Sequence, residues 1–284
     1  MTDFGIAGLQ LELSHCDNLK SIEEEVQTTV HLFPWVKMIV LSELCSFGSN
    51  PDKAQSLKGK AYATYSKLAK DHQIYLVTGS YFVREGDHTY NTSLVFDPRG
   101  TEIARYAKMF PFEPYETGIT PGTDFCLFEI PDVGKFGLSI CYDMWFPETT
   151  RTLAWMGAEV ILHPTMTGTI DRDAEISIAR ASAVTNQVYF FDINGAGKLG
   201  NGRSAIISPE GDVLHQAGSG REIIPLNVNF DYLRKTRKNG LKHLGQPLKS
   251  FRDNKLQFPP YQKGAQSPSL DALGPIEKPS HKPS

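Results

Sequence analysis

Three residues of the sequence combine a reactive side chain with a position at or near the end of a predicted strand. Glu43 lies near the end of MIVLSEL, Lys108 ends TEIARYAK and Cys141 lies near the end of KFGLSICYD. Side chains at strand ends emerge at the carboxyl edge of a sheet, where open α/β folds usually place their sites. A carboxylate, an ammonium and a thiol that met there could supply a general base, a positive charge and a nucleophile.

Glu43 and Lys108 each allow two interpretations. A carboxylate that follows several apolar residues is expected to be partly buried, and burial raises its pKa towards the range of a general base. A buried ammonium at Lys108 could stabilise an oxyanion. Taken singly, Glu43 also fits a strand-end acid that faces solvent or pairs with a lysine, and Lys108 also fits an ordinary surface residue.

Cys141 precedes a helix that is predicted to begin near Pro147. A helix N-terminus and a nearby cation both favour the thiolate, which is the nucleophilic form of cysteine. The backbone N–H of Tyr142 could add a donor for an oxyanion. Taken alone, Cys141 also fits a buried structural cysteine. The weaker candidates are the other three cysteines: Cys16, Cys45 and Cys126.

The elements that must position these side chains alternate along the chain. The sequence predicts helices over residues 18–36, 51–72, 147–158, 171–187 and 231–238. It predicts strands over residues 4–13, 38–44, 73–83, 125–131, 135–143, 159–164, 188–195 and 221–230, and hairpins over 90–108 and 203–218. This mixture predicts an α/β protein with more antiparallel pairing than a doubly wound sheet carries.

Size and charge limit the possible partners and compartments. The chain has 284 residues, enough for one large domain, and its net charge of −3 does not suggest nucleic acid or an anionic membrane as a partner. The eight histidines are scattered, which argues against a metal site. The N-terminal segment does not resemble a signal peptide, and no run approaches the roughly 18 apolar residues of a membrane span. A cytoplasmic protein with free thiols is therefore expected.

The C-terminal part has a different composition. The alternating pattern decays from about residue 239, and the last residues are rich in Pro, Ser and Lys. Such a segment has too little apolar surface to fold alone. We therefore predict a domain over residues 1–250 and, over residues 251–284, a disordered tail or an arm that packs on a partner subunit.

The order Glu43, Lys108, Cys141 resembles the Glu–Lys–Cys triad of the nitrilase superfamily of carbon–nitrogen hydrolases. The surrounding strings LSELCSFG, YAKMFPF and SICYDMWFPE resemble the acid, lysine and cysteine motifs of that family. The strings NTSLVFDPRG, TPGTDF and GRSAIISPEGDVL resemble its hairpins and turns. The resemblance covers about residues 3 to 250, nearly the whole part that is predicted to fold.

This resemblance implies a four-layer α-β-β-α sandwich, with two mixed six-stranded sheets face to face and helices outside. It implies a homodimer or a larger homo-oligomer and no metal or organic cofactor. It also implies a further glutamate in the loop after the lysine. Glu116, shortly before Pro121-Gly122, fits that position better than Glu113, which lies closer to Lys108.

The resemblance further implies an amidase-type branch, since true nitrilases typically carry Trp-Glu where this chain has Tyr142-Asp143. The expected reaction converts a small, largely neutral carboxamide to a carboxylic acid and ammonia or an amine through a cysteine thioester. The alternatives within the superfamily are an N-carbamoyl amine or amino-acid hydrolase and a nitrilase. The residues expected to contact substrate are Tyr115, Tyr142, Trp145, Phe146, His163 and Thr165.

Two alternative interpretations do not involve a Glu–Lys–Cys hydrolase. A Cys–His thiol enzyme would use His163, the only histidine at a comparable strand end, although no papain-like signature surrounds Cys141. A strand-end histidine is more often a hydrogen-bonded structural residue. A scaffold that kept the fold and lost the chemistry is the second alternative, although such relatives usually lose a member of the triad and this chain keeps all three.

Overall fold

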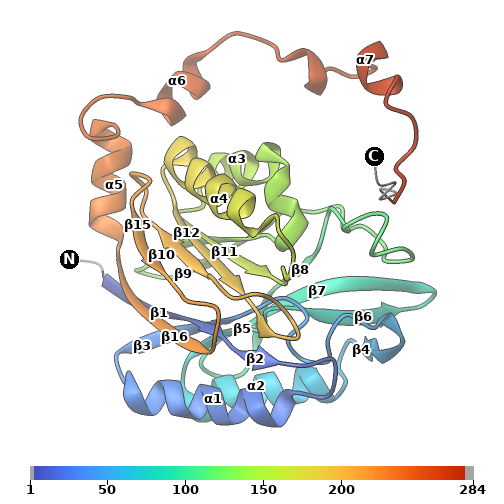
Figure 1. Cartoon of the computed structure of the whole chain (residues 1–284). Coiled ribbons are helices and arrows are strands. Elements are labelled where there is room, and N and C mark those ends of the chain that lie inside the picture. The colour runs from blue at the N-terminus through green and yellow to red at the C-terminus, as the bar shows by residue number, and fades with distance from the viewer. Residues whose placement is uncertain (1–2, 279–284) are drawn as a thin grey trace.

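The computed structural model, which describes residues 3–278, has four layers (Figure 1). Two β-sheets lie face to face at the centre. Helices α1 (Leu19–Leu32) and α2 (Lys60–His72) cover the outer face of one sheet. Helices α3 (Pro147–Met156) and α4 (Arg172–Asn186) cover the outer face of the other. The predicted α-β-β-α sandwich is confirmed.

The first sheet is mixed and has eight strands rather than the expected six. Its order is β16-β1-β3-β5-β7-β6-β4, with β8 also paired to β7. The strands are β1 (Asp3–Gln10), β3 (Val36–Leu41), β4 (Gln55–Ser56), β5 (Tyr75–Val77), β6 (Tyr81–Glu85), β7 (His88–Phe96), β8 (Glu102–Ala107) and β16 (Glu222–Asn229). One extra strand is the two-residue β4. The other arises because Gly79, at φ +66°, divides the predicted strand over residues 73–83 into β5 and β6.

The second sheet has six strands, as expected, in the order β15-β14-β12-β11-β10-β9. Its parallel centre is β10, β11 and β12, with antiparallel strands on both sides. The strands are β9 (Cys126–Ile130), β10 (Gly134–Leu138), β11 (Val160–Thr165), β12 (Tyr189–Asn194), β14 (Ala205–Ile207) and β15 (Val213–Gln216). A short parallel pair, β2 (Glu12–Leu13) with β13 (Ala196–Gly197), lies outside both sheets.

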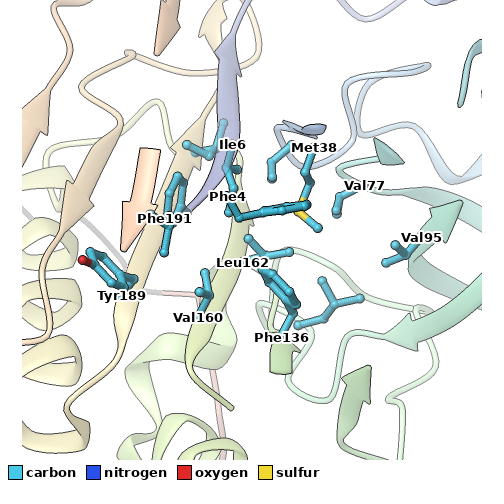
Figure 2. Close-up of a cluster of buried hydrophobic side chains, with 14 of the residues drawn as sticks. Phe4, Ile6, Met38, Val77, Val95, Phe136, Val160, Leu162, Tyr189 and Phe191 are labelled. Atoms are coloured by element: carbon cyan, nitrogen blue, oxygen red, sulfur yellow. The ribbon is translucent and has the colours of Figure 1, made fainter. Parts of the chain in front are cut away.

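The main core lies between the two sheets (Figure 2). Because side chains alternate along a strand, Met38 and Val40 of β3 face the other sheet while Ile39 and Leu41 face the helices. On the second sheet, inward-facing side chains include Phe136, Val160, Leu162, Tyr189 and Phe191. Burial of each such side chain contributes about 1.5–3 kcal/mol, so this core holds the two sheets together.

Two helix predictions need correction. The predicted helix over residues 51–72 begins only at Lys60, because Pro51–Lys53 form a separate 3₁₀ turn that is capped by Asn50. The predicted helix over residues 18–36 ends at Leu32. Ile22 and Val26 of α1 are fully buried, whereas Leu32, at the last position of the helix, is exposed.

The chain continues beyond α5 (Phe230–Asn239) as an arm over residues 247–278 that passes above α3 and α4 (Figure 1). The arm contains α6 (Pro247–Asp253), a 3₁₀ turn (Pro259–Tyr261) and α7 (Pro268–Asp271). It touches α3 where the Tyr261 hydroxyl donates to Glu148 at 2.6 Å. Within residues 3–278, the helices are too short or too polar to traverse a lipid bilayer.

Candidate active site

Glu43 lies just beyond the end of β3 and is buried, with 2% of its surface exposed. Its Oε1 accepts hydrogen bonds from Asn91 Nδ2 at 2.8 Å and from Lys108 Nζ at 2.9 Å. Its backbone N–H donates to the carbonyl oxygen of Thr165 at 3.2 Å. Since Thr165 ends β11, this bond joins the edges of the two sheets at the site.

Lys108 follows β8 and is 1% exposed. Its Nζ donates to Glu43 at 2.9 Å and to Glu116 Oε2 at 2.7 Å. Burial alone would lower the pKa of Lys108, but the negative charges of Glu43 and Glu116 and the hydrogen bond to Glu116 outweigh burial and raise this pKa well above its usual range. The lysine therefore stays a cation at neutral pH.

Glu116, rather than Glu113, reaches the buried cluster. Its carboxylate accepts from Lys108, from the backbone N–H of Phe112 at 2.6 Å and from Asn91 at 3.4 Å. Glu113 is exposed. The structure thus brings Glu43, Lys108 and Glu116 together from three separate segments.

Cys141 does not end a strand, as the sequence suggested, but begins a 3₁₀ helix (Cys141–Trp145) three residues after β10. Its φ of +47° lies in the left-handed region, which is unusual for a residue with a side chain. This backbone turn is sharp, and the thiol interacts with the side chains of both Glu43 and Thr165. The sulfur therefore joins the cluster of the acid and the lysine.

The two features that were expected to favour the thiolate of Cys141 are outweighed in the structure. Burial, followed by the negative charge of Glu43, raises the pKa of the thiol well above its ordinary value, and Lys108 offsets this only in part. The 3₁₀ segment is also too short to carry the dipole of a full helix. Nucleophilic chemistry at this sulfur therefore requires a base. Burial raises the pKa of the Glu43 carboxyl too, which makes it a better proton acceptor than an exposed glutamate.

Two supporting residues were not identified from the sequence. Asn91, in β7, donates to both Glu43 and Glu116 and so fixes the two carboxylates relative to each other. Asp143 accepts from the Tyr106 hydroxyl and from the backbone N–H groups of Phe110 and Ile140, at 2.7–2.9 Å. Asp143 thereby connects the segment around Cys141, which we call the cysteine loop, to the segment that follows Lys108, which we call the lysine loop. The only feature of the sequence that could have indicated these roles is that Asn91 and Asp143 are polar residues next to apolar runs.

An aromatic wall borders the cysteine and lysine loops. Tyr142 packs against Phe112 and Phe146, with ring centroids 4.8 and 5.4 Å apart. Phe146 in turn stacks on Phe110 at 3.7 Å. The wall comprises three residues that were predicted from the sequence, Tyr115, Tyr142 and Phe146, and two that were missed, Phe110 and Phe112.

Trp145 and His163 were also predicted to contact substrate, but they lie largely outside this wall. Trp145 contacts Tyr142 at 6.2 Å but also lines a cavity of about 710 Å³ under the C-terminal arm. His163 is fully buried, pairs with the Ser139 hydroxyl at 2.7 Å and lies 5.3 Å from the Phe190 ring. Burial and two nearby cations lower the pKa of His163 to about 3. This environment fits a structural histidine rather than a substrate contact or the base of a Cys–His pair.

Thr165 contacts the thiol, and behind it lies a buried charged cluster. Arg172 Nη1 lies 3.0 Å from Glu175, and Nη2 lies 2.7 Å from Asp192. All three side chains are almost fully buried. The sequence of α4 gave no indication of this cluster because its members fit an ordinary amphipathic helix and a strand.

A family model described as carbon-nitrogen hydrolase matches residues 10–238 of the chain. The omega-amidase NIT2 of Homo sapiens is 29% identical over 262 residues, covering 84% of this chain and 93% of that protein. The omega-amidase NIT2 of Xenopus tropicalis is 30% identical over 203 residues, covering 66% and 73%. Saccharomyces cerevisiae Nit3, of branch 10 of the nitrilase superfamily, superposes with a TM-score of 0.77 at 27% identity over 84% of this chain and 94% of that one.

Proposed function

The chain belongs to the carbon–nitrogen hydrolase family, and we propose that it is an amidase that converts a small, largely neutral carboxamide to a carboxylic acid and ammonia or an amine. One observation carries this proposal: the acid, the ammonium and the thiol, which come from distant segments, lie together, with Lys108 donating to Glu43 at 2.9 Å and the thiol interacting with Glu43. The names of its relatives, omega-amidases among them, support an amide as the substrate class.

The first half of the proposed reaction forms a thioester. Glu43 takes the proton of Cys141, and the sulfur attacks the amide carbonyl carbon. Lys108 and the backbone N–H of Tyr142 stabilise the negative oxygen that develops. Glu43 then gives its proton to the leaving nitrogen, and ammonia or an amine departs.

The second half releases the acid. Glu43 removes a proton from a water molecule, which attacks the thioester carbon, and the thiolate leaves and regains its proton from Glu43. Glu116 holds Lys108 and Asn91 in place during both halves, since it binds both side chains. The high pKa of the resting thiol makes the base indispensable at the first step.

Charge pairing around the thiol favours a neutral substrate. Lys108 already faces Glu43 and Glu116, and Arg172 already faces Glu175 and Asp192. A carboxylate on the substrate would have to compete with these buried pairs, which disfavours an N-carbamoyl amino acid. The aromatic wall offers apolar contact instead.

The decisive experiment is a panel of simple carboxamides, nitriles and N-carbamoyl compounds with ammonia detection for each. We expect turnover of small neutral carboxamides by the natural protein and none by Cys141→Ala, with both proteins showing the same circular dichroism. The matched control is Cys45→Ala, which removes a buried cysteine outside the cluster. Near-normal hydrolysis by Cys141→Ala would overturn the proposal.

The predicted assembly and compartment are also proposals. We propose a homodimer or larger homo-oligomer that uses the side of α3 and the arm, because Trp155 is 71% exposed there and the arm carries exposed apolar side chains such as Leu256 and Leu270. The four cysteines are free, which supports a cytoplasmic location because reducing compartments keep thiols unpaired.

A further inference from the structure

A chain of hydroxyl groups runs from the nucleophile into the protein behind it. The Thr165 side chain interacts with the Cys141 thiol and lowers its pKa. The Thr165 Oγ1 lies 3.3 Å from Thr167 Oγ1, and Thr167 Oγ1 donates to Glu175 Oε1 at 2.9 Å. All members except the partly exposed cysteine are almost fully buried. The scheme for amide hydrolysis does not use Thr167 or Glu175.

The charges around Glu175 do not balance when every group is ionised. Arg172 supplies one positive charge between the carboxylates of Glu175 and Asp192. One buried cation offsets one buried anion, so one carboxyl gains by holding a proton. Burial, followed by the charge of Asp192, raises the pKa of Glu175 to about 7, so this carboxyl changes its charge near neutral pH.

The protonation state of Glu175 determines in which direction the hydroxyl groups of Thr167 and Thr165 donate their hydrogen bonds, because each hydroxyl carries one hydrogen. When Glu175 is ionised, Thr167 donates to it and Thr165 donates to Thr167. The Thr165 oxygen then offers only lone pairs to the sulfur. When Glu175 is protonated, its hydroxyl donates to Thr167 and Thr167 donates to Thr165. Thr165 is then free to donate to a thiolate.

We propose that Glu175 is a positioning residue for Cys141 that acts through Thr167 and Thr165, its protonated form supplying a hydrogen bond to the thiolate and its ionised form withdrawing it. This inference deepens the proposed function and rests on it. The negative charge of Glu175 acts in the same direction, since it raises the thiol pKa. The other charged or titratable groups that act on Glu175 or are acted on by it are Arg172 on α4, Asp192 on β12 and Cys141 on the 3₁₀ helix. His163 on β11, which is near Arg172, is neutral.

The test measures thiol reactivity directly, so it does not depend on amide turnover. Natural protein and Glu175→Gln are treated with methyl methanethiosulfonate, a small neutral reagent without an amide bond, between pH 5.5 and 9. Peptide mass spectrometry gives the rate at Cys141, and the exposed Cys16 of the same molecule serves as the reference. Glutamine keeps the shape and a permanent donor, and Arg172 stays paired with Asp192.

The rate at Cys141 is first divided by the rate at Cys16 of the same protein. The quotient that we follow is this normalised rate in the natural protein divided by the normalised rate in Glu175→Gln, because the titration of Glu43 is common to both proteins. We expect this quotient to fall about three- to tenfold as pH rises through the Glu175 pKa of about 7, which corresponds to roughly half to one unit of thiol pKa. A quotient that stays constant over the whole pH range would overturn the inference.

Thr167 provides a second pair of variants that leaves the charged cluster intact. Thr167→Val removes the hydroxyl and should reduce the fall in the quotient near neutral pH to the part caused by the Glu175 charge alone, whereas Thr167→Ser retains the hydroxyl and should keep the full fall. A fall in Thr167→Val as large as that in the natural protein would also overturn the inference. The pH profile of kcat/KM for a carboxamide is measured in parallel. If the protein does not turn over the carboxamide but the reactivity quotient still falls near neutral pH, the result counts against the proposed function and not against the role of Glu175.

Discussion

At the residue scale, the candidate site is defined by how charges are distributed among a few buried groups. Lys108 lies between two carboxylates and stays charged, while Cys141 stays a neutral thiol in the resting protein. The same acid that raises the thiol pKa also interacts with the thiol and can remove its proton. Glu43 therefore adds to the effect of burial on the resting thiol and also provides the base that activates it.

Glu43→Gln tests this double role. We expect kcat for a carboxamide to fall by about 10²–10⁴-fold, the usual contribution of a general base. Reactivity of Cys141 towards methyl methanethiosulfonate at pH 8 should rise, since loss of the Glu43 charge lowers the thiol pKa. The matched control is Glu113→Gln, an exposed acid of the lysine loop, which should change neither rate. Retained turnover in Glu43→Gln would rule out this residue as the base.

Asp143→Asn tests the tie between the cysteine and lysine loops. The carboxylate accepts from three donors, whereas an amide oxygen and an NH₂ group cannot satisfy all three. We expect a loss of about 1–3 kcal/mol in the free energy of unfolding, measured by urea denaturation. The exposed Asp87→Asn should stay within about 0.5 kcal/mol of the natural protein. Equal stability of the two variants would contradict the role of Asp143.

Part of the site could be predicted from the sequence, and the remainder could not. Glu43, Lys108 and Cys141 were candidates because each lies close to the end of a predicted strand, and their order and motifs, which resemble those of the nitrilase superfamily, singled them out. The structure brings them together. Asn91 and Glu175 were not, because their partners lie on other strands and nothing local distinguishes them from ordinary strand and helix residues. The extent to which burial outweighs the nearby cation at the Cys141 thiol could not be predicted either, because it depends on the packing around the sulfur.

At the element scale, turns place the site as much as strands do. The strands and helices follow from hydrophobic periodicity, which is why most were predicted close to their observed bounds. The positions at which a strand or helix is interrupted depend on backbone geometry, which hydrophobic periodicity does not show. Gly79 divides one predicted strand into two, and its Cα lies against the backbone of Ser42, next to Glu43. The turn between β5 and β6 therefore supports the segment that carries the acid.

Gly79→Ala tests this support. A Cβ at Gly79 would overlap the carbonyl oxygen of Ser42, in addition to adopting an unfavourable positive φ. We expect the free energy of unfolding to fall by more than about 2 kcal/mol and kcat to decrease. Gly86→Ala is the matched control, because Gly86 has a similar φ of +59° but open space around it. It should lose only about 1 kcal/mol and keep its kcat.

At the scale of the whole molecule, the two outer layers differ. The side of α3 carries Trp155 and lies beneath the C-terminal arm, which makes few contacts with the domain. The arm touches α3 at Arg151, whose guanidinium lies 5.0 Å from the Phe251 ring, and at Glu148. The sequence predicted a distinct segment there from its composition, but composition does not show its path over α3 and α4.

Trp155→Glu tests the proposed assembly. We expect light scattering to give a mass of at least twice 31.6 kDa for the natural protein at micromolar concentration. The variant should shift towards the monomer, because a buried unpaired carboxylate opposes association. Leu32→Glu, on the opposite outer layer, should leave the mass unchanged. A natural protein that remains monomeric, or an equal shift in both variants, would contradict this interface.

The bond between the Glu43 backbone and Thr165 has a consequence for how activity is gained and lost. The acid and the lysine belong to the sheet built mostly from the first hundred residues, whereas the thiol belongs to the sheet built after residue 125. Neither half of the polypeptide holds a complete set of reacting groups. Turnover therefore requires that the two halves of the chain pack against each other. When the protein is heated, we expect activity to disappear at the same temperature as the core between the sheets, with no weakly active intermediate.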